Sequence, residues 1–240
     1  MASDDASDGS AMKNILLEEL PEAHREVLVR AILNVLSTEI AEATYAQIVD
    51  GVPLPDVVED TYNQGPIPVG HPILEHNELC PGVKDKLQEF RGRFNPGTLE
   101  FTSTVSSPLL AKSKIPDIFQ LFHAYQAASV GSRAFKIKLV EMTAVAIHQL
   151  AVNLYELKES FHEEDYLDSW ERPGATSFDR IYYSERPPVT LFQHQWYLDF
   201  EQYPHGVGDV IGYWAEARIF GGVVLFDRNP KTEVDTLPCT

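Results

Sequence analysis

The feature that most constrains this fold is one long apolar segment, residues 132–158, which carries a single polar row. A helix that is apolar on every side lies inside a protein, so we expect a long buried central helix. Glu141, His148 and Tyr155 follow one another at intervals of seven, which places them along one helical stripe, with Arg133 roughly in line. Ionisable groups in such a helix must have partners or line a cavity. The pattern therefore locates a candidate site without naming its chemistry.

An excess of acidic residues limits the partners of this chain. There are 36 acidic against 19 basic residues, which gives a formal net charge of −17. Such a surface repels phosphate, so we expect neither nucleic-acid nor membrane binding. Charged residues interrupt the segment 132–158, which argues against a membrane span, and the first residues lack the apolar region of a secretory signal. We expect a soluble, cytoplasmic protein.

Turn residues and hydrophobic periodicity divide the chain into elements. We expect residues 1–13 to form a disordered acidic tail and residues 14–240 a single globular domain. Besides the central helix, the pattern predicts helices over residues 21–49, 56–62, 83–94, 116–128 and 208–220. Short strands are predicted over residues 98–105, 180–184, 189–193 and 223–227. The predicted fold class is α+β, mainly α-helical, with a few short strands in the C-terminal third.

The segment between Arg186 and Arg218 contains no lysine or arginine and is rich in aromatic residues, among them Trp196, Tyr213 and Trp214. Aromatic faces beside carboxylates suit a small organic or cationic ligand, because the rings attract cations and the acids supply counter-charge. An aromatic core with ordinary acidic caps is the alternative interpretation.

Glu216 lies on one helical stripe with Tyr213, within the segment that ends near Arg218. It can act as an acid or base in a partly dry pocket, or it can form a structural ion pair, for example with Arg133. We also expect a carboxylate from a neighbouring helix, such as Glu216, to approach His148, because Glu141 is two helical turns away.

Two short motifs contain metal-binding residue types. His71 and His76 are one residue further apart than in helical zinc motifs, with Pro72 between them. Glu159 and His162 match one half of a di-iron motif whose second copy is missing. No metal site is predicted from them, no cofactor is assigned, and the two cysteines imply no disulfide framework.

Three runs of the sequence resemble a family of ascomycete fungal proteins without an assigned activity. These runs are Gly51 to Asp56, Gly65 to Pro72, and Gly212 to Glu216 through Asp227-Arg228. A weaker similarity exists to cyclodipeptide synthases, whose catalytic helix carries Tyr-x-x-x-Glu. Here Tyr213 and Glu216 are one residue closer together, and the family's N-terminal serine motif is missing. That resemblance implies an aminoacyl-transfer enzyme that binds tRNA through a basic patch.

The leading hypothesis is a small-molecule enzyme of unknown reaction, with a site between the central helix and the aromatic segment. Its proposed acid–base residues are Glu141, His148 and Glu216, and its substrate-binding residues are Tyr155, Arg133, Trp196, Tyr213, Trp214 and Arg218. A non-catalytic protein-interaction module is the alternative, and a cyclodipeptide-synthase-like enzyme is the third hypothesis. The group that lies beside the His148 ring discriminates among these three hypotheses.

Overall fold

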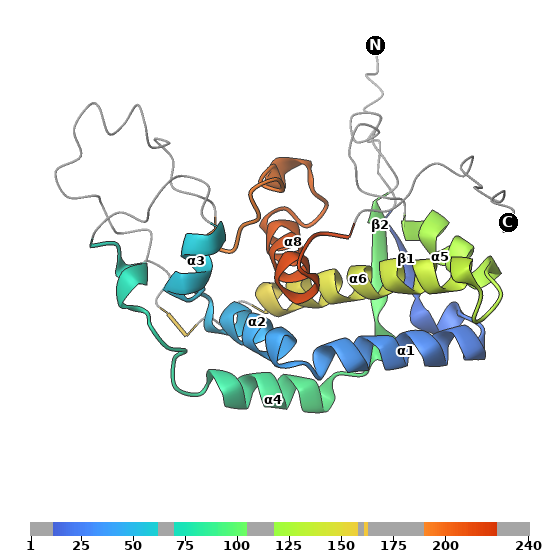
Figure 1. The fold of residues 1–240 in the computed structure, drawn as a ribbon, viewed down its shortest axis with the longest axis horizontal. Helices are drawn as coiled ribbons and strands as arrows, with labels where there is room; N and C mark the ends of the chain where they lie inside the picture. The colour runs from blue at the N-terminus through green and yellow to red at the C-terminus, as the bar shows by residue number, and fades with distance from the viewer. Residues whose placement is uncertain (1–11, 62–69, 105–117, 158–160, 163–189, 225–240) are drawn as a thin grey trace, which may run out of the picture.

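The computed structural model describes residues 12–61, 70–104, 118–157, 161–162 and 190–224. This part of the chain is mainly helical, with one small sheet (Figure 1). Its α-helices are α1 (Glu22–Leu36), α2 (Glu39–Asp50), α3 (Pro55–Thr61), α4 (Val83–Arg93), α5 (Ile118–Ala127), α6 (Arg133–Glu156) and α8 (Val207–Phe220). Short 3-10 helices span Leu17–Glu19, Pro72–Glu75, Pro96–Thr98 and Phe200–Gln202. The predicted α+β, mainly helical class is confirmed.

Helix α6 is the central element, as its sequence predicts. Helices α8, α5, α1 and α2 all pack against it, and α4 packs against α2 (Figure 1). Met142, Ile147 and Leu150 of α6 are buried in the core. This helix is long and apolar enough to cross a membrane, but 56% of the relevant window is buried inside the protein. Its composition is therefore accounted for by its contacts with the other helices.

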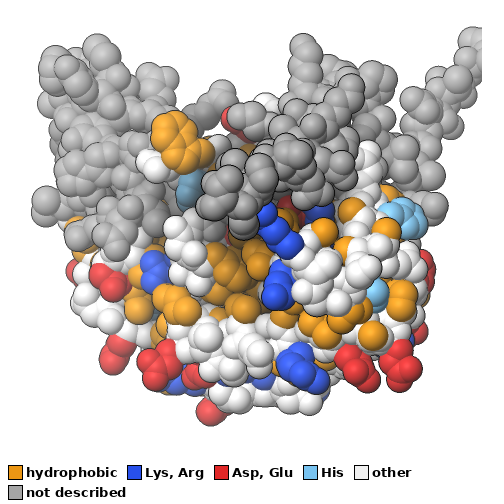
Figure 2. All heavy atoms as spheres, turned by 45° about the vertical axis from the view of Figure 1, so that its right-hand side comes forward, with side chains coloured by type: hydrophobic (Ala, Val, Ile, Leu, Met, Phe, Trp, Pro, Cys, Tyr) orange, Lys and Arg blue, Asp and Glu red, His pale blue; other side chains and the backbone are white. Residues whose placement is uncertain are grey.

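The N-terminal half of α6 is less buried than its sequence indicates. Ile137 and Val140 are 46% and 55% exposed. Figure 2 shows that apolar side chains gather on one face of the described surface, with lysines and arginines among them. The expectation of a helix buried on all sides is thus met only in the middle of α6, over residues 141–152, because Asn153, Tyr155 and Glu156 are exposed again.

The described sheet lies outside the C-terminal third, where most of the strands are predicted. Strand β1 (Met12–Leu16) pairs with β2 (Glu100–Thr104) in antiparallel register, with Met12 opposite Thr104. The strand predicted over residues 98–105 is therefore present, and its partner includes two residues assigned to the tail. Residues 190–193 and 223–224 form no strand, and residues 180–184 lie outside the described part. Within the described residues of the C-terminal third the predicted strands are absent, because a strand forms only where a second strand pairs with it.

The helix predicted over residues 21–49 is two helices, broken at Ser37 and Thr38. Thr38 is the N-cap of α2, where its hydroxyl oxygen accepts a hydrogen bond from the Ala41 N–H at 3.3 Å. The same hydroxyl donates to the Val35 carbonyl at 2.7 Å, which closes the end of α1. One threonine therefore terminates one helix and starts the next.

We predict that Thr38→Ala lowers the free energy of unfolding by about 1 kcal/mol, the usual cost of losing a helix N-cap. Ser37→Ala is the matched control, because the Ser37 hydroxyl donates only to the Asn34 carbonyl at the exposed end of α1. Urea denaturation of both variants and the wild type measures the difference. Equal midpoints for the two variants would show that Thr38 does not cap α2.

Candidate functional site

His148 occupies the interface between α6 and α8, where glycine on α8 makes room for it. An ideal Cβ at Gly212 would lie 2.4 Å from His148 Nε2. At Gly208, one turn earlier, a Cβ would lie 3.2 Å from Val152 Cγ1 of α6. Glycine at these positions lets the two helices approach closely, and the imidazole ring rests against the α8 backbone.

Two carboxylates of α8 bind the two nitrogens of this imidazole. His148 Nδ1 lies 2.7 Å from Glu216 Oε1, and His148 Nε2 lies 3.0 Å from Asp209 Oδ1. The expected approach of Glu216 to His148 is therefore observed, and Asp209 adds a second carboxylate that the sequence analysis did not assign to the site. Asp209 and Glu216 are seven residues apart on α8, the same spacing that separates Glu141, His148 and Tyr155 on α6. This spacing is the sequence signal that places Asp209 and Glu216 on one face of α8.

The remaining carboxylate oxygens also have partners. Asp209 Oδ2 accepts a hydrogen bond from the His205 N–H at 2.8 Å, and Glu216 Oε2 accepts one from the Val224 N–H at 3.2 Å. All four oxygens and both ring nitrogens are thus engaged. A satisfied buried network of this kind rigidifies a helix interface.

The charge of this network follows from its contacts. Burial alone would lower the pKa of His148, but its hydrogen bonds and charge interactions with Asp209 and Glu216 outweigh burial and raise the pKa to about 9. His148 is therefore an imidazolium at neutral pH. It balances one of the two buried negative charges beside it.

Glu141 and Arg133 do not join His148. The buried Glu141 pairs with Lys138 Nζ of its own helix at 2.7 Å. Arg133 is exposed, and Glu216 binds His148 instead of pairing with Arg133. Tyr155, the third member of the row, is 39% exposed near the end of α6. Glu141, His148 and Tyr155 thus follow one stripe of α6, but their side chains have different neighbours.

The aromatic residues predicted to bind substrate fall into two groups. Tyr213 lies edge to face with His148, with ring centroids 4.7 Å apart, and Tyr197 stacks on Tyr213 at 4.3 Å. Burial, followed by the charges of Asp209 and Glu216, raises the pKa of Tyr213, so its hydroxyl stays protonated. The other group lies further along α8 and in the loop before it. Trp214 is buried against Phe192, the Arg218 guanidinium lies 5.6 Å from the Trp214 ring, and Trp196 is 76% exposed.

A second cluster brings together donors that metals prefer, in a part of the fold where no site is predicted from the sequence. Asp50, His76, Cys80 and His162 each offer one ligand atom, and these atoms all lie within 4.8 Å of one another. Asp50 Oδ2 is 2.8 Å from His76 Nε2, and Asp50 Oδ1 is 3.3 Å from His162 Nε2. Cys80 Sγ lies 3.5 Å from His162 Nε2.

Local backbone structure brings these four side chains together. Asp50 is the last residue of α2, which ends at Gly51 in the left-handed conformation. His76 caps the 3-10 helix Pro72–Glu75, and Cys80 lies in the turn before α4. The Phe161 N–H donates to the Asp50 carbonyl at 3.2 Å, which holds the adjacent His162 beside the end of α2. The short segment 161–162 therefore lies beside the end of α2, beyond the C-terminal end of α6 (Figure 1).

The Phe161 ring also packs over Gly82, where a Cβ would approach it to 3.3 Å. Gly82 has φ of 97°, the left-handed region that favours glycine, and it begins α4 immediately after the Cys80 turn. The backbone on both sides of the cluster is thus fixed by contacts of its own.

The electrostatics of this cluster differ from those around His148. Burial lowers the pKa of His162, against the effect of Asp50, so this imidazole is neutral at pH 7. Burial, together with the hydrogen bond and charge of Asp50, raises the pKa of the Cys80 thiol to about 11. The protein alone therefore leaves the Cys80 sulfur protonated, although it lies among metal-binding atoms.

Each of the two motifs that were not predicted to bind metal contributes one residue to this cluster. His76 comes from the His71–His76 pair, while the His71 ring nitrogen accepts a hydrogen bond from the Ile73 N–H at 3.2 Å. His162 comes from the unmatched half of the di-iron motif. The signal that was missed is the His-x-x-x-Cys spacing of His76 and Cys80, although nothing in the sequence connects it to Asp50 or His162.

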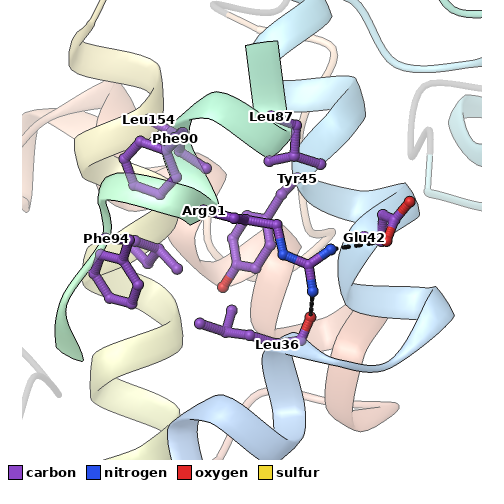
Figure 3. Close-up of a pocket in the computed structure, with 9 residues that line it drawn as sticks. Leu36, Glu42, Tyr45, Leu87, Phe90, Arg91, Phe94 and Leu154 are labelled. Atoms are coloured by element: carbon purple, nitrogen blue, oxygen red, sulfur yellow. Dashed lines mark hydrogen bonds and ion pairs between the residues drawn. The ribbon is translucent and has the colours of Figure 1, made fainter. Parts of the chain in front are cut away.

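A small cavity lies elsewhere, between the α1–α2 junction, α4 and α6 (Figure 3). It is lined by Tyr45, Phe90 and Phe94, and its rim carries Arg91, which binds Glu42 at 2.8 Å and the Leu36 carbonyl. Its volume of about 10 Å³ is room for one water molecule and not for an organic substrate.

Comparison with known proteins gives no further guide to the site. No protein family, no curated protein and no solved structure matches this chain.

We predict that the stabilising effect of His148 disappears at alkaline pH. Its folded pKa of about 9 lies above its unfolded value, so the stabilisation is complete below about pH 6.5 and is lost as the pH rises through 9. The free-energy gap between wild type and His148→Gln should shrink by about 3 kcal/mol from about pH 6 to about pH 10. Urea denaturation of both proteins at each pH measures this gap. A gap that does not change with pH would show that the imidazolium is not what holds α8.

We predict that Gly212→Ala destabilises the protein by about 1 to 3 kcal/mol, because the methyl group must displace the His148 ring. Gly92→Ala in α4 is the matched control, since a Cβ there meets nothing within 4 Å. That control should be neutral or stabilising by up to about 1 kcal/mol, because alanine favours helix more than glycine does. Thermal denaturation compares the two variants, and equal melting temperatures would contradict the close packing of His148 on α8.

Proposed function

We propose that this chain is a zinc-binding protein in which Asp50, His76, Cys80 and His162 hold one structural Zn²⁺ ion. The observation that carries the proposal is that four potential ligand groups each place one donor atom within 4.8 Å of the others. Each belongs to a type that zinc binds in proteins: imidazole nitrogen, thiolate sulfur and carboxylate oxygen.

The distances within the cluster support tetrahedral coordination. Zinc bonds of about 2.0 to 2.3 Å at tetrahedral angles separate nitrogen and oxygen ligands by about 3.3 Å, and nitrogen and sulfur ligands by about 3.6 Å. The contacts of His162 with Asp50 and Cys80, at 3.3 and 3.5 Å, agree with these separations. The 2.8 Å contact joins His76 Nε2 to the other carboxylate oxygen, Asp50 Oδ2, which would remain a hydrogen-bond partner if Oδ1 is the zinc ligand.

Charge supports the same interpretation. Asp50 is fully buried, and His76 is only 7% exposed. Two neutral imidazoles, one carboxylate and one thiolate balance the two positive charges of Zn²⁺, so the complete centre is neutral. The carbonyl end of α2, where Asp50 lies, also favours a cation through the helix dipole.

A structural role follows from the number of ligands. Four protein ligands fill the tetrahedral sphere of zinc, whereas catalytic zinc sites keep one position for water or substrate. The ligands come from three segments that are distant in sequence, at residues 50, 76–80 and 162. An ion bound by all three would cross-link the end of α2, the turn before α4 and the chain beyond α6.

The small-molecule enzyme predicted from the sequence remains a hypothesis with less support. A general acid or base needs a nitrogen or oxygen free to contact a substrate. Both nitrogens of His148 are bound to Asp209 and Glu216, whose remaining oxygens bind backbone N–H groups. This network favours a structural role for His148 over a catalytic one.

We predict that the full-length protein purifies with one zinc ion per chain. Elemental analysis after exhaustive buffer exchange should find this stoichiometry in the wild type and in His123→Ala, which removes an exposed histidine of α5. His76→Ala and His162→Ala should retain far less metal, because three ligands hold zinc less tightly than four. Adding zinc to metal-stripped wild type should raise the free energy of unfolding by about 4 kcal/mol at a thousandfold excess over Kd.

His76→Ala and His162→Ala should lose zinc whether or not they remain folded. The His123→Ala control shows whether the loss is specific to histidines of the cluster. The proposal fails if the wild type purifies without zinc and also gains no stability when zinc is added. It also fails if His76→Ala and His162→Ala bind zinc as tightly as the wild type does.

A further inference from the structure

Resting on the zinc centre proposed above, we propose that Cys80 makes zinc binding sensitive to peroxide, so that oxidation of its sulfur releases the ion. Cys80 supplies the one sulfur among the four ligand groups. Zinc coordination keeps it as a thiolate, the form of cysteine that peroxides oxidise. The other three ligands are not oxidised under the same conditions, so the effect is localised to one atom.

The Cys80 turn is the more exposed side of the cluster, the side from which peroxide would approach. Asp50 is fully buried and His76 nearly so, whereas Cys80 is only half-buried. The two residues that follow it, Pro81 and Gly82, are exposed. The zinc centre therefore has a protected side formed by α2 and an accessible side formed by the Cys80 turn.

Each bond in the oxidation step can be assigned. The Cys80 thiolate sulfur attacks one oxygen of hydrogen peroxide, a sulfur–oxygen bond forms, and the oxygen–oxygen bond breaks. The departing hydroxide takes up a proton and becomes water. The sulfur loses two electrons and the peroxide gains them, which leaves Cys80 as a sulfenic acid.

Release of zinc follows from the change in charge and ligand strength. The thiolate contributes one of the two negative charges that neutralise the ion, and a protonated sulfenic acid contributes none. Zinc would then have three strong ligands and an uncompensated positive charge beside a partly buried histidine pair. Because Asp50 and Cys80 belong to different segments, loss of the ion also removes the cross-link between α2 and the turn before α4.

The step is reversible with an external thiol. Cys80 is the one cysteine within the described residues, and the chain has one other, Cys239. A thiol such as glutathione condenses with the sulfenic acid and expels water, and a second thiol then reduces the mixed disulfide to restore Cys80. Thus oxidation would release zinc and a thiol-reducing environment would allow it to bind again.

The test uses the zinc-loaded full chain with a colorimetric zinc chelator and a small molar excess of hydrogen peroxide. The wild type and Cys239→Ser should both release about one zinc ion per chain, and glutathione should restore zinc binding after the peroxide is removed. Cys80→His keeps four ligands of types that zinc accepts, so it should bind zinc and should not release it with peroxide. A sulfenic-acid probe followed by peptide mass spectrometry should label Cys80 at the rate at which zinc appears.

Each result identifies which proposal fails. A wild type that binds zinc and retains it in peroxide overturns the redox inference and leaves the zinc centre standing. Zinc release that requires Cys239, or that precedes labelling of Cys80, also overturns the inference. If Cys80→His does not bind zinc, the wild type still tests the redox inference, because the rate of Cys80 labelling can be compared with the rate of zinc release. A wild type that never binds zinc overturns both proposals.

Discussion

A carboxylate taken out of water must be compensated by positive charge, and three buried carboxylates fix much of how this protein is assembled. Asp209 and Glu216 lie on α8 and share the His148 imidazolium of α6. Asp50 lies at the end of α2, fully buried, beside His76, Cys80 and His162. Because an isolated buried charge costs far more than a single packing contact contributes, these groups determine where helices and loops meet.

The two clusters satisfy this requirement to different degrees. Around His148 every polar atom has a partner, and glycine at position 212 provides the space for the ring. That network is complete without any additional ion or molecule. Around Asp50, a thiol whose pKa is about 11 and two imidazoles converge on a carboxylate, and a divalent cation is the group whose charge and geometry suit all four. These contrasts support the proposal of an architectural role for the first cluster and of metal binding for the second.

The sequence predicts local features of this fold better than contacts between distant segments. The 24-residue helix α6 follows from its hydrophobic pattern, and α8 ends at Gly221 as its glycine pair indicates. The partner of β2 was missed because β1 begins at Met12, in a stretch whose composition resembles a disordered tail.

His148 and Glu216 were identified as candidate residues, but Asp209 was not assigned to them. The Asp50 cluster was missed because the other three residues lie 26 to 112 positions from Asp50, and His76 and His162 lie in motifs that fail when each is considered alone. Spacing rules find metal sites within one element, whereas this cluster exists only after three separate segments have folded together.

X-ray absorption spectroscopy at the zinc edge of the purified 240-residue chain reports directly on the ligands of the proposed ion. We predict a four-coordinate ion with one sulfur at about 2.3 Å and three nitrogen or oxygen ligands at about 2.0 to 2.2 Å. The sulfur contribution should disappear in Cys80→His while the coordination number remains four. A six-coordinate shell of oxygen ligands, or the absence of zinc from a protein purified with zinc present, would contradict the proposed centre.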